Sequence, residues 1–220
     1  MSDIFQEVEE DLRRERMQSL WDRYAVYVIA VALLVVAGVA GWRGWEWYSS
    51  RQASEASSRF AAAIAQADAG QSDAAQAALE TMATDAPSGY VVLARFRAAA
   101  EIGRGDAAAG IAAYEGLAGD GSVEQPLREL ATLRAGLLEL QQGAGYDALL
   151  ARLEPLTAAT GTWRHSAREV LAFGALAADN DVDARRWAEA AVADSEAPPG
   201  VRNRAQIVIE LLADQPAAAT

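Results

Sequence analysis

Side chains that commonly carry out catalysis are scarce in this chain of 220 residues. His165 is the only histidine and there is no cysteine, so one chain can assemble neither a zinc site nor a Cys–His nucleophile. A general base also needs a positioned partner, and the sequence suggests none for His165. We therefore expect His165 to be a polar residue in the first turn of a helix, beside Trp163 and Arg164.

Two further patterns could carry chemistry, and both are weak. Gly103-Arg104-Gly105 resembles a fragment of a nucleotide-binding loop, but the third glycine and a preceding strand are missing. The acidic pairs lie where they would cap helices or face solvent, although a helical hydrolase or lyase that uses such residues stays open in principle. We predict that the protein is not an enzyme and that it needs no catalytic residue, cofactor, metal or small-molecule substrate.

Arginine provides a more informative polar pattern. Three arginines fall on the predicted first helices of successive helical hairpins: Arg97, Arg134 and Arg168. In an acidic domain they would form a basic stripe for a carboxylate or an acidic partner. The alternative is ordinary pairing with acidic residues one turn away, as between Arg97 and Glu101. We name the three arginines as candidate protein-binding residues and keep both interpretations.

Nineteen consecutive residues without a charge, from Tyr24 to Trp42, are enough for a helix that crosses a membrane. Aromatic residues flank this span, as is typical of both membrane–water interfaces: Tyr24, Tyr27, Trp42, Trp45, Trp47 and Tyr48. A cleaved signal peptide is the alternative, because Gly38 and Ala40 satisfy the small-residue rule for cleavage. Seven acidic residues precede the span, however, whereas the corresponding region of a signal peptide is short and basic. We predict an uncleaved anchor.

Gly38, Gly41 and Gly44 recur at every third position of the span and would form a strip of small residues on one helix face. Helices in lipid pack closely through such strips, so a partner helix could pack here. Small residues are also common in membrane spans without any partner. Four arginines before the span and three after it favour, weakly, a cytoplasmic N-terminus.

The net charge of −12 excludes one class of partner. An acidic surface repels nucleic acid and anionic lipid headgroups, so we expect no nucleic-acid binding. We divide the chain into a cytoplasmic tail (1–23), a transmembrane helix (24–45), a helical repeat domain (46–214) and a flexible tail (215–220).

A repeated dipeptide organises the larger part of the chain. Helix-forming residues dominate residues 52–214, without the alternation typical of strands. Asp-Ala recurs, starting at Asp73, Asp106, Asp147 and Asp183, at spacings of 33, 41 and 36 residues. Each copy follows a helix breaker: Gly70, Gly105, Gly143 with Gly145, and Asn180. We expect each breaker to close a helix in the left-handed conformation and each aspartate to cap the next helix.

The spacing predicts an all-α fold, a right-handed α-solenoid of about four hairpins similar to tetratricopeptide repeats. The hairpins pair 54–69 with 73–84, 90–103 with 106–117, 126–142 with 147–158, and 163–178 with 183–194. A last helix, 201–212, would cover the fourth hairpin. Our predicted core residues are Tyr90, Phe96, Leu127, Leu130, Leu133, Leu137, Leu171 and Trp187. The W-x2-L-G-x2-Y signature of these repeats is absent.

Three segments carry a resemblance to a known family. GWRGWEWYSSRQ follows the apolar span, SGYVVLARFRAAA covers Ser88–Ala100, and GTWRHSAREVLAFGALAADNDVDARRWAEAAV covers Gly161–Val192. From Val26 onward the chain resembles, in order and spacing, the YfgM-like proteins, including Trp163 and Trp187. Those proteins are tetratricopeptide-like ancillary subunits of the SecYEG translocon, anchored in the inner membrane.

The resemblance implies a single-pass protein of the inner (plasma) membrane whose C-terminal domain is periplasmic. It also implies an adaptor that links the SecYEG translocon to periplasmic chaperones. An anchored scaffold for envelope assembly or cell-division machinery, without translocon contact, is the alternative hypothesis.

Overall fold

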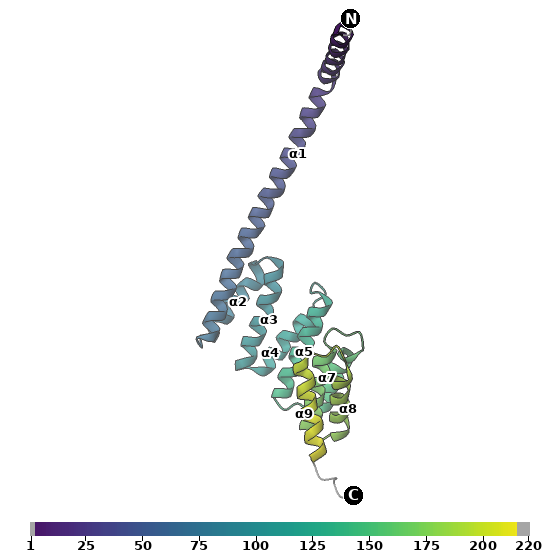
Figure 1. Ribbon diagram of the computed structural model, residues 1–220. Coiled ribbons are helices and arrows are strands. Elements are labelled where there is room, and N and C mark those ends of the chain that lie inside the picture. Colours follow the sequence, from purple (N-terminus) through teal and green to yellow (C-terminus); the bar gives the residue numbers. More distant parts are fainter. Residues whose placement is uncertain (1–2, 215–220) are drawn as a thin grey trace. The chain divides into compact units, whose positions relative to one another are not determined.

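The computed structural model describes residues 3–214, and all regular structure in this range is helical (Figure 1). The predicted tail at 215–220 lies outside it. The elements are α1 (Asp3–Asp68), α2 (Ser72–Asp85), α3 (Ser88–Gly105), α4 (Ala107–Ala118), α5 (Gln125–Gln141), α6 (Tyr146–Leu153), a 3-10 helix η1 (Glu154–Thr157), α7 (Arg164–Ala177), α8 (Asp181–Ala193) and α9 (Pro199–Asp214). The chain divides into two compact units, Met1–Glu55 and Ala56–Thr220, which we describe in turn.

The first unit is formed by α1. Among the described residues, one stretch is long and apolar enough to cross a membrane, and it lies within Arg23–Asp68 of this helix. Its large apolar side chains are more than half exposed, including Val26, Ile29, Leu34 and Val39. A helix that leaves apolar groups exposed on all sides calls for an apolar environment. The exposure therefore fits lipid contact.

The expected start of a separate helix near Ser54 is wrong. α1 continues without a break through this region to Asp68, so its last turns form the first helix of the first hairpin. The physical reason is local: residues 45–68 contain neither proline nor glycine, and alanine, glutamate, glutamine and arginine all favour helix.

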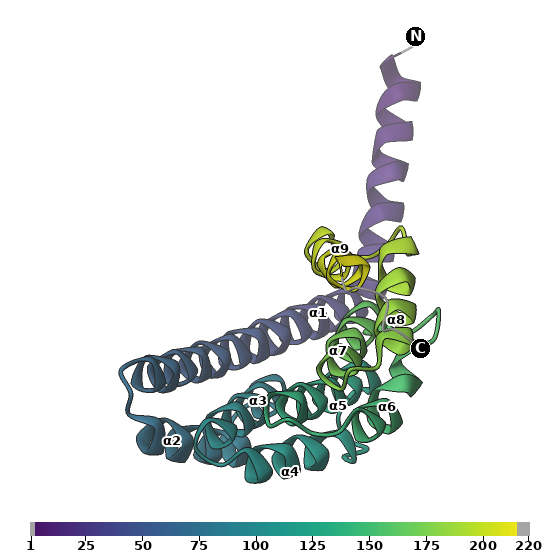
Figure 2. The ribbon, with the colours of Figure 1, turned by 90° about the horizontal axis from the view of Figure 1, so that it is seen from below.

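The second unit contains the four predicted hairpins and the closing helix, which follow one another along a curved path (Figure 2). The second helix of the third hairpin is shorter than expected, because α-helix stops at Leu153 and continues as η1. Pro155 lacks an N–H group and its ring clashes with the carbonyl of Ala151 in an α-helix. α9 covers the last hairpin through Val201, Ala205, Val208 and Leu212, all buried, which confirms the predicted covering helix.

The apolar core is divided among successive hairpins. Of the predicted core residues, Leu133, Leu171 and Trp187 are buried, and Tyr90, Phe96, Leu127, Leu130 and Leu137 are partly buried against the clusters. The buried Trp187 donates a hydrogen bond of 2.8 Å from Nε1 to the Tyr146 hydroxyl. The polar edge of this indole is therefore satisfied inside the core.

Two glycines close helices in the left-handed conformation as predicted, whereas Gly105, Gly145 and the asparagine do not adopt it. Gly70 and Gly143 have φ values of 78° and 74°, in the left-handed region. Near the third turn, Asp179 takes this conformation with φ 53°. Asn180 instead caps α8, where its side-chain oxygen accepts a hydrogen bond of 3.1 Å from the Asp183 N–H.

The predicted capping role of the repeated aspartates is correct at one of four positions. Asp106 caps α4 by accepting a hydrogen bond of 3.0 Å from the Ala109 N–H. The other three lie inside the first turn, because each helix begins one or two residues earlier than expected: Asp73, Asp147 and Asp183. A carboxylate in the first turn still interacts favourably with the positive end of the helix dipole.

Glycine also sets the distance between α3 and α4. An added Cβ at Gly110 would lie 2.5 Å from the Gly103 Cα, so the two backbones are in direct contact. This contact, and not a nucleotide-binding loop, explains the glycine at Gly103. The nearby Gly116 on α4 has no neighbouring atom within 4 Å of an added Cβ.

Asp194 joins the start of α7 to the end of α8. Its Oδ2 lies 2.9 Å from Arg164 Nε, 3.1 Å from Arg168 Nη1 and 3.4 Å from His165 Nδ1. The hydrogen bond from Arg164 is the main reason that the pKa of Asp194 falls to about 2. Burial, followed by the charge of Arg164, lowers the pKa of His165.

We predict that Gly110→Ala destabilises the protein by about 1–3 kcal/mol, because the methyl group forces α3 and α4 apart. Gly116→Ala is the control on the same helix and should stabilise by about 0.5–1 kcal/mol, because alanine reduces the entropy of the unfolded chain. Urea unfolding of the full-length protein in detergent micelles, followed by circular dichroism, measures both. Equal effects of the two substitutions would contradict the backbone contact.

We also predict a pH-dependent effect of Asp194→Asn. The folded-state pKa of Asp194 lies below its value in the unfolded chain, about 3.9. Its charge therefore stabilises the fold above about pH 4, and this contribution is lost as pH falls toward 2. The variant should unfold at a lower temperature than wild type at pH 7, and the difference should shrink between pH 4 and pH 2.

Glu189→Gln is the matched control, since it removes one carboxylate from the exposed face of α8. Its unfolding midpoint should follow that of the wild type at every pH. A pH-independent difference for Asp194→Asn would mean that its charge does not carry the effect.

Candidate protein-binding groove

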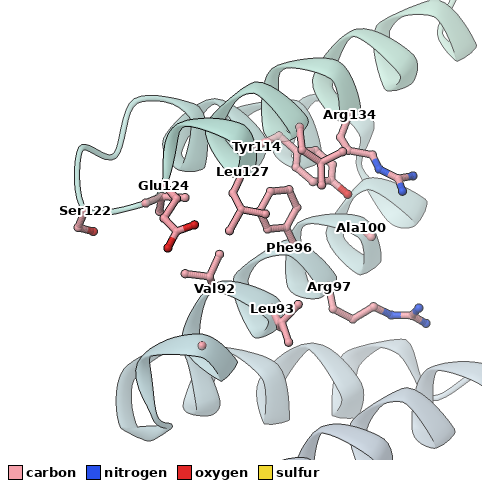
Figure 3. A pocket seen from close by; sticks show the side chains of 13 residues that line it. Val92, Leu93, Phe96, Arg97, Ala100, Tyr114, Ser122, Glu124, Leu127 and Arg134 are labelled. Carbon is pink, nitrogen blue, oxygen red and sulfur yellow. The ribbon is translucent and has the colours of Figure 1, made fainter. Parts of the chain in front are cut away.

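A groove of ≈ 660 Å³ lies between α3 and α5, the first helices of the second and third hairpins (Figure 3). Both helices pack against α4, which lies behind them. The residues that line the groove are Gly89, Val92, Leu93, Phe96, Arg97 and Ala100 on α3, Tyr114 on α4, Ser122, Val123 and Glu124 in the following loop, and Leu127, Leu130 and Arg134 on α5. Apolar side chains dominate the middle.

Helical spacing explains why these side chains share one groove. On α3, Leu93, Phe96 and Ala100 follow one another at intervals of three and four residues, which places them on one face. On α5, Leu127, Leu130 and Arg134 do the same. Phe96 packs against the Tyr114 ring with centroids 6.1 Å apart, so α4 provides an aromatic floor.

The two ends of the groove differ in charge. Arg97 and Arg134 extend from opposite walls at one end, and Tyr114 directs its hydroxyl toward the same end (Figure 3). Ser122 and Glu124 lie at the other end. Burial raises the pKa of Tyr114, and the positive charges of Arg134 and Arg97 oppose this rise. Both cations therefore lie within electrostatic range of the phenol.

Arg97 is held in place by a buried carboxylate. Its Nε lies 2.7 Å from Glu101 Oε1, and its Nη2 lies 3.8 Å from Asp68 Oδ1. The Glu101 side chain is 0% exposed and also pairs with Arg104 at 2.8 Å. A buried carboxylate is tolerated only when it is paired, so Glu101 orients the Arg97 guanidinium at the groove.

Arg134 differs from Arg97 in having no fixed partner. Its side chain is exposed, and no ion pair to it occurs in the part of the chain that the structure describes. The local pairing expected as an alternative therefore applies to Arg97, and not to Arg134. The guanidinium of Arg134 is available for a ligand.

The third candidate arginine lies elsewhere. Arg168 pairs with Asp194 and donates a hydrogen bond of 3.0 Å from Nη2 to the Thr157 carbonyl oxygen. It is mostly buried, with 14% of its side chain exposed. The structure thus brings Arg97 and Arg134 together, while Arg168 connects α7, α8 and η1.

His165 lies in the first turn of α7, as expected, with its Nδ1 facing Asp194. Asp194 is already bound by Arg164 and Arg168, so this cluster ties two helices together. Among the residues whose side chains the structure describes, no group of three or more histidine, cysteine, aspartate or glutamate side chains is placed to hold a metal ion.

The three membrane-span glycines lie on α1. An added Cβ at Gly38, Gly41 or Gly44 would meet no atom within 4 Å, so this face is open. Helix packing on it stays a prediction.

Sequence reasoning missed Tyr114, Leu93 and Glu124 as groove residues. The helical period placed Phe96, Leu127 and Leu130 on apolar faces, but it did not show that these faces are left partly uncovered. Arg134 with Leu127 and Leu130, at intervals of three and four residues, was the available signal on α5.

Comparison with known proteins identifies the fold family. The family model described as "Tetratricopeptide repeat-like domain" matches residues 18–208, which is most of the chain. No curated protein and no solved structure matches this chain significantly. Repeat domains of this kind are typically non-catalytic modules for protein interaction. The hairpin order, the groove on the first helices and the extent of this match agree, and the chain belongs to the tetratricopeptide repeat-like domain family.

Proposed function

We propose that this protein is a noncatalytic membrane-anchored adaptor that binds proteins in the groove between α3 and α5. The observation that carries the proposal is the open apolar groove on two successive first helices. In a helical solenoid, this face commonly receives an extended or helical segment of a partner. Leu93, 50% exposed, contributes apolar surface that a partner would cover.

The membrane anchor follows from α1. Its exposed apolar side chains and its flanking aromatic residues, including Trp42, Trp45 and Trp47, support insertion in a bilayer. We further propose that the N-terminus is cytoplasmic and the helical domain periplasmic, in the inner membrane. The distribution of arginines and the resemblance to YfgM-like proteins support this orientation.

The same resemblance supports a link between the SecYEG translocon and periplasmic chaperones. Anchoring confines the groove to the membrane surface, so a chaperone bound there has a high effective concentration near an emerging client. No chemical step is needed for this role. It depends on the anchor and the groove alone.

We predict that Leu93→Glu reduces recovery of the groove's protein partner at least tenfold when the full-length protein is purified in mild detergent. Burial of one leucine contributes about 1.5–3 kcal/mol, and a buried unpaired carboxylate adds a further cost. Quantitative mass spectrometry should detect SecYEG subunits and a periplasmic chaperone with the wild type. The chaperone should be lost with the variant.

Ile207→Glu is the matched control, because Ile207 on α9 is 53% exposed and lies outside the groove. It should retain all partners. Equal recovery with the two variants would contradict groove binding. Recovery of envelope-assembly proteins in place of SecYEG would support the scaffold hypothesis and refute the translocon link.

A further inference from the structure

Tyr114 carries an unused polar group at the floor of the groove. The residue is 6% exposed, and its hydroxyl has no hydrogen-bond partner among the described residues. The ring is buried, but the hydroxyl oxygen is not among the buried unpaired atoms and reaches solvent in the groove, where it is free to bond with a ligand. The hydroxyl is directed to the end of the groove where Arg97 and Arg134 lie (Figure 3).

The groups at this end are all hydrogen-bond donors. A guanidinium has five N–H donors and no acceptor, so neither arginine can accept the proton of the Tyr114 hydroxyl. Glu101 forms ion pairs with Arg97 and Arg104 and makes no hydrogen bond to Tyr114. A ligand that offers an acceptor could therefore replace water at this end of the groove. A carboxylate matches two guanidinium groups and a phenol in both charge and geometry.

The opposite end has the opposite charge. Glu124 is exposed and has no ion pair in the described part of the chain. Ser122 is engaged locally, because its hydroxyl and N–H both donate to Asp120 Oδ1, at 2.6 and 2.9 Å. Glu124 is thus the free charge at this end. A cation is the complementary group.

The dimensions of the groove indicate the form of its ligand. Glu124 directly precedes α5, and Arg134 lies ten residues further along the chain on this helix, about 15 Å away at 1.5 Å per residue. Dividing ≈ 660 Å³ by this length leaves a cross-section of about 44 Å². An extended chain, about 4.8 by 10 Å, has about this cross-section, and a helix about 10 Å wide would lie partly outside the groove. At 3.3 Å per residue, the length corresponds to four or five extended residues.

We propose that the groove binds an extended protein segment with a fixed order of charges, which deepens the proposed protein-binding function and rests on it. Apolar side chains of the segment fill the middle of the groove. An acidic side chain lies between Arg97, Arg134 and the Tyr114 hydroxyl. A basic side chain, four or five residues away, lies beside Glu124.

The test is a selection of random peptides displayed between Gly-Ser spacers, so that only side chains supply carboxylates. The target is the full-length protein in lipid nanodiscs, and peptides bound by empty discs are removed. Wild type should enrich three or four apolar residues flanked by an acidic residue and, on the other side, a basic one. Arg134→Glu should reverse the preference at the acidic position, because it replaces a cation by an anion. The fold should be retained, because Arg134 has no internal partner to lose.

Affinities of one selected peptide, acetylated and amidated, separate the contributions. Arg134→Gln should weaken binding about tenfold and Tyr114→Phe severalfold, since phenylalanine keeps the ring and removes only the donor. Replacing the acidic residue of the peptide by its amide should cause a similar loss, with little further loss in Arg134→Gln. Arg185→Gln, on α8 outside the groove, should bind as wild type does.

Each outcome decides between the two proposals. Enrichment of apolar peptides without an acidic residue, or only of peptides that end in a free carboxylate, overturns the charge-ordered internal segment and leaves groove binding intact. Peptides that bind Leu93→Glu as well as wild type, or no enrichment over empty discs, overturn groove binding as well. Unchanged selection by Arg134→Glu overturns the carboxylate site.

Discussion

The contact between the backbones of α3 and α4 at Gly103 and Gly110 is the constraint on which the groove depends. Only residues without a side chain allow two helices to approach this closely. Tyr114 lies one turn after Gly110 on the same face of α4, so the contact also places its ring behind α3. α5 also packs against α4, and the space left between α3 and α5 becomes a groove with an aromatic floor.

Electrostatics then divides this groove into two unlike ends. The chain is strongly acidic, and most arginines whose side chains the structure describes form ion pairs with carboxylates. Arg168 is one example, since Asp194 and the Thr157 carbonyl oxygen hold it inside the last hairpins. Arg134 has no such partner, and the buried Glu101 keeps Arg97 beside it. A small donor-rich region within an acidic protein gains specificity because other surfaces repel an acidic ligand.

Much of the fold could be predicted because its signals are local. Gly70 and Gly143 mark turns that need positive φ, and the Asp-Ala spacing identified all four hairpins. The errors also have local causes that the pattern did not weigh. No breaker separates the membrane span from the first hairpin, so one helix serves both. Asn180 was a better cap than Asp183, because it lies one residue before α8 begins.

The sequence by itself determined the helical character of the chain, the order of its hairpins, the closing helix and the apolar span, since each depends on residues within a few turns of one another. Only the tertiary structure decided which side chains meet across helices. Arg97, Arg134 and Arg168 occupy equivalent first helices, yet two line a groove and one is buried in an ion cluster. The rotation and separation of neighbouring helices set that difference, and both follow from packing at positions such as Gly110 that no local pattern reveals.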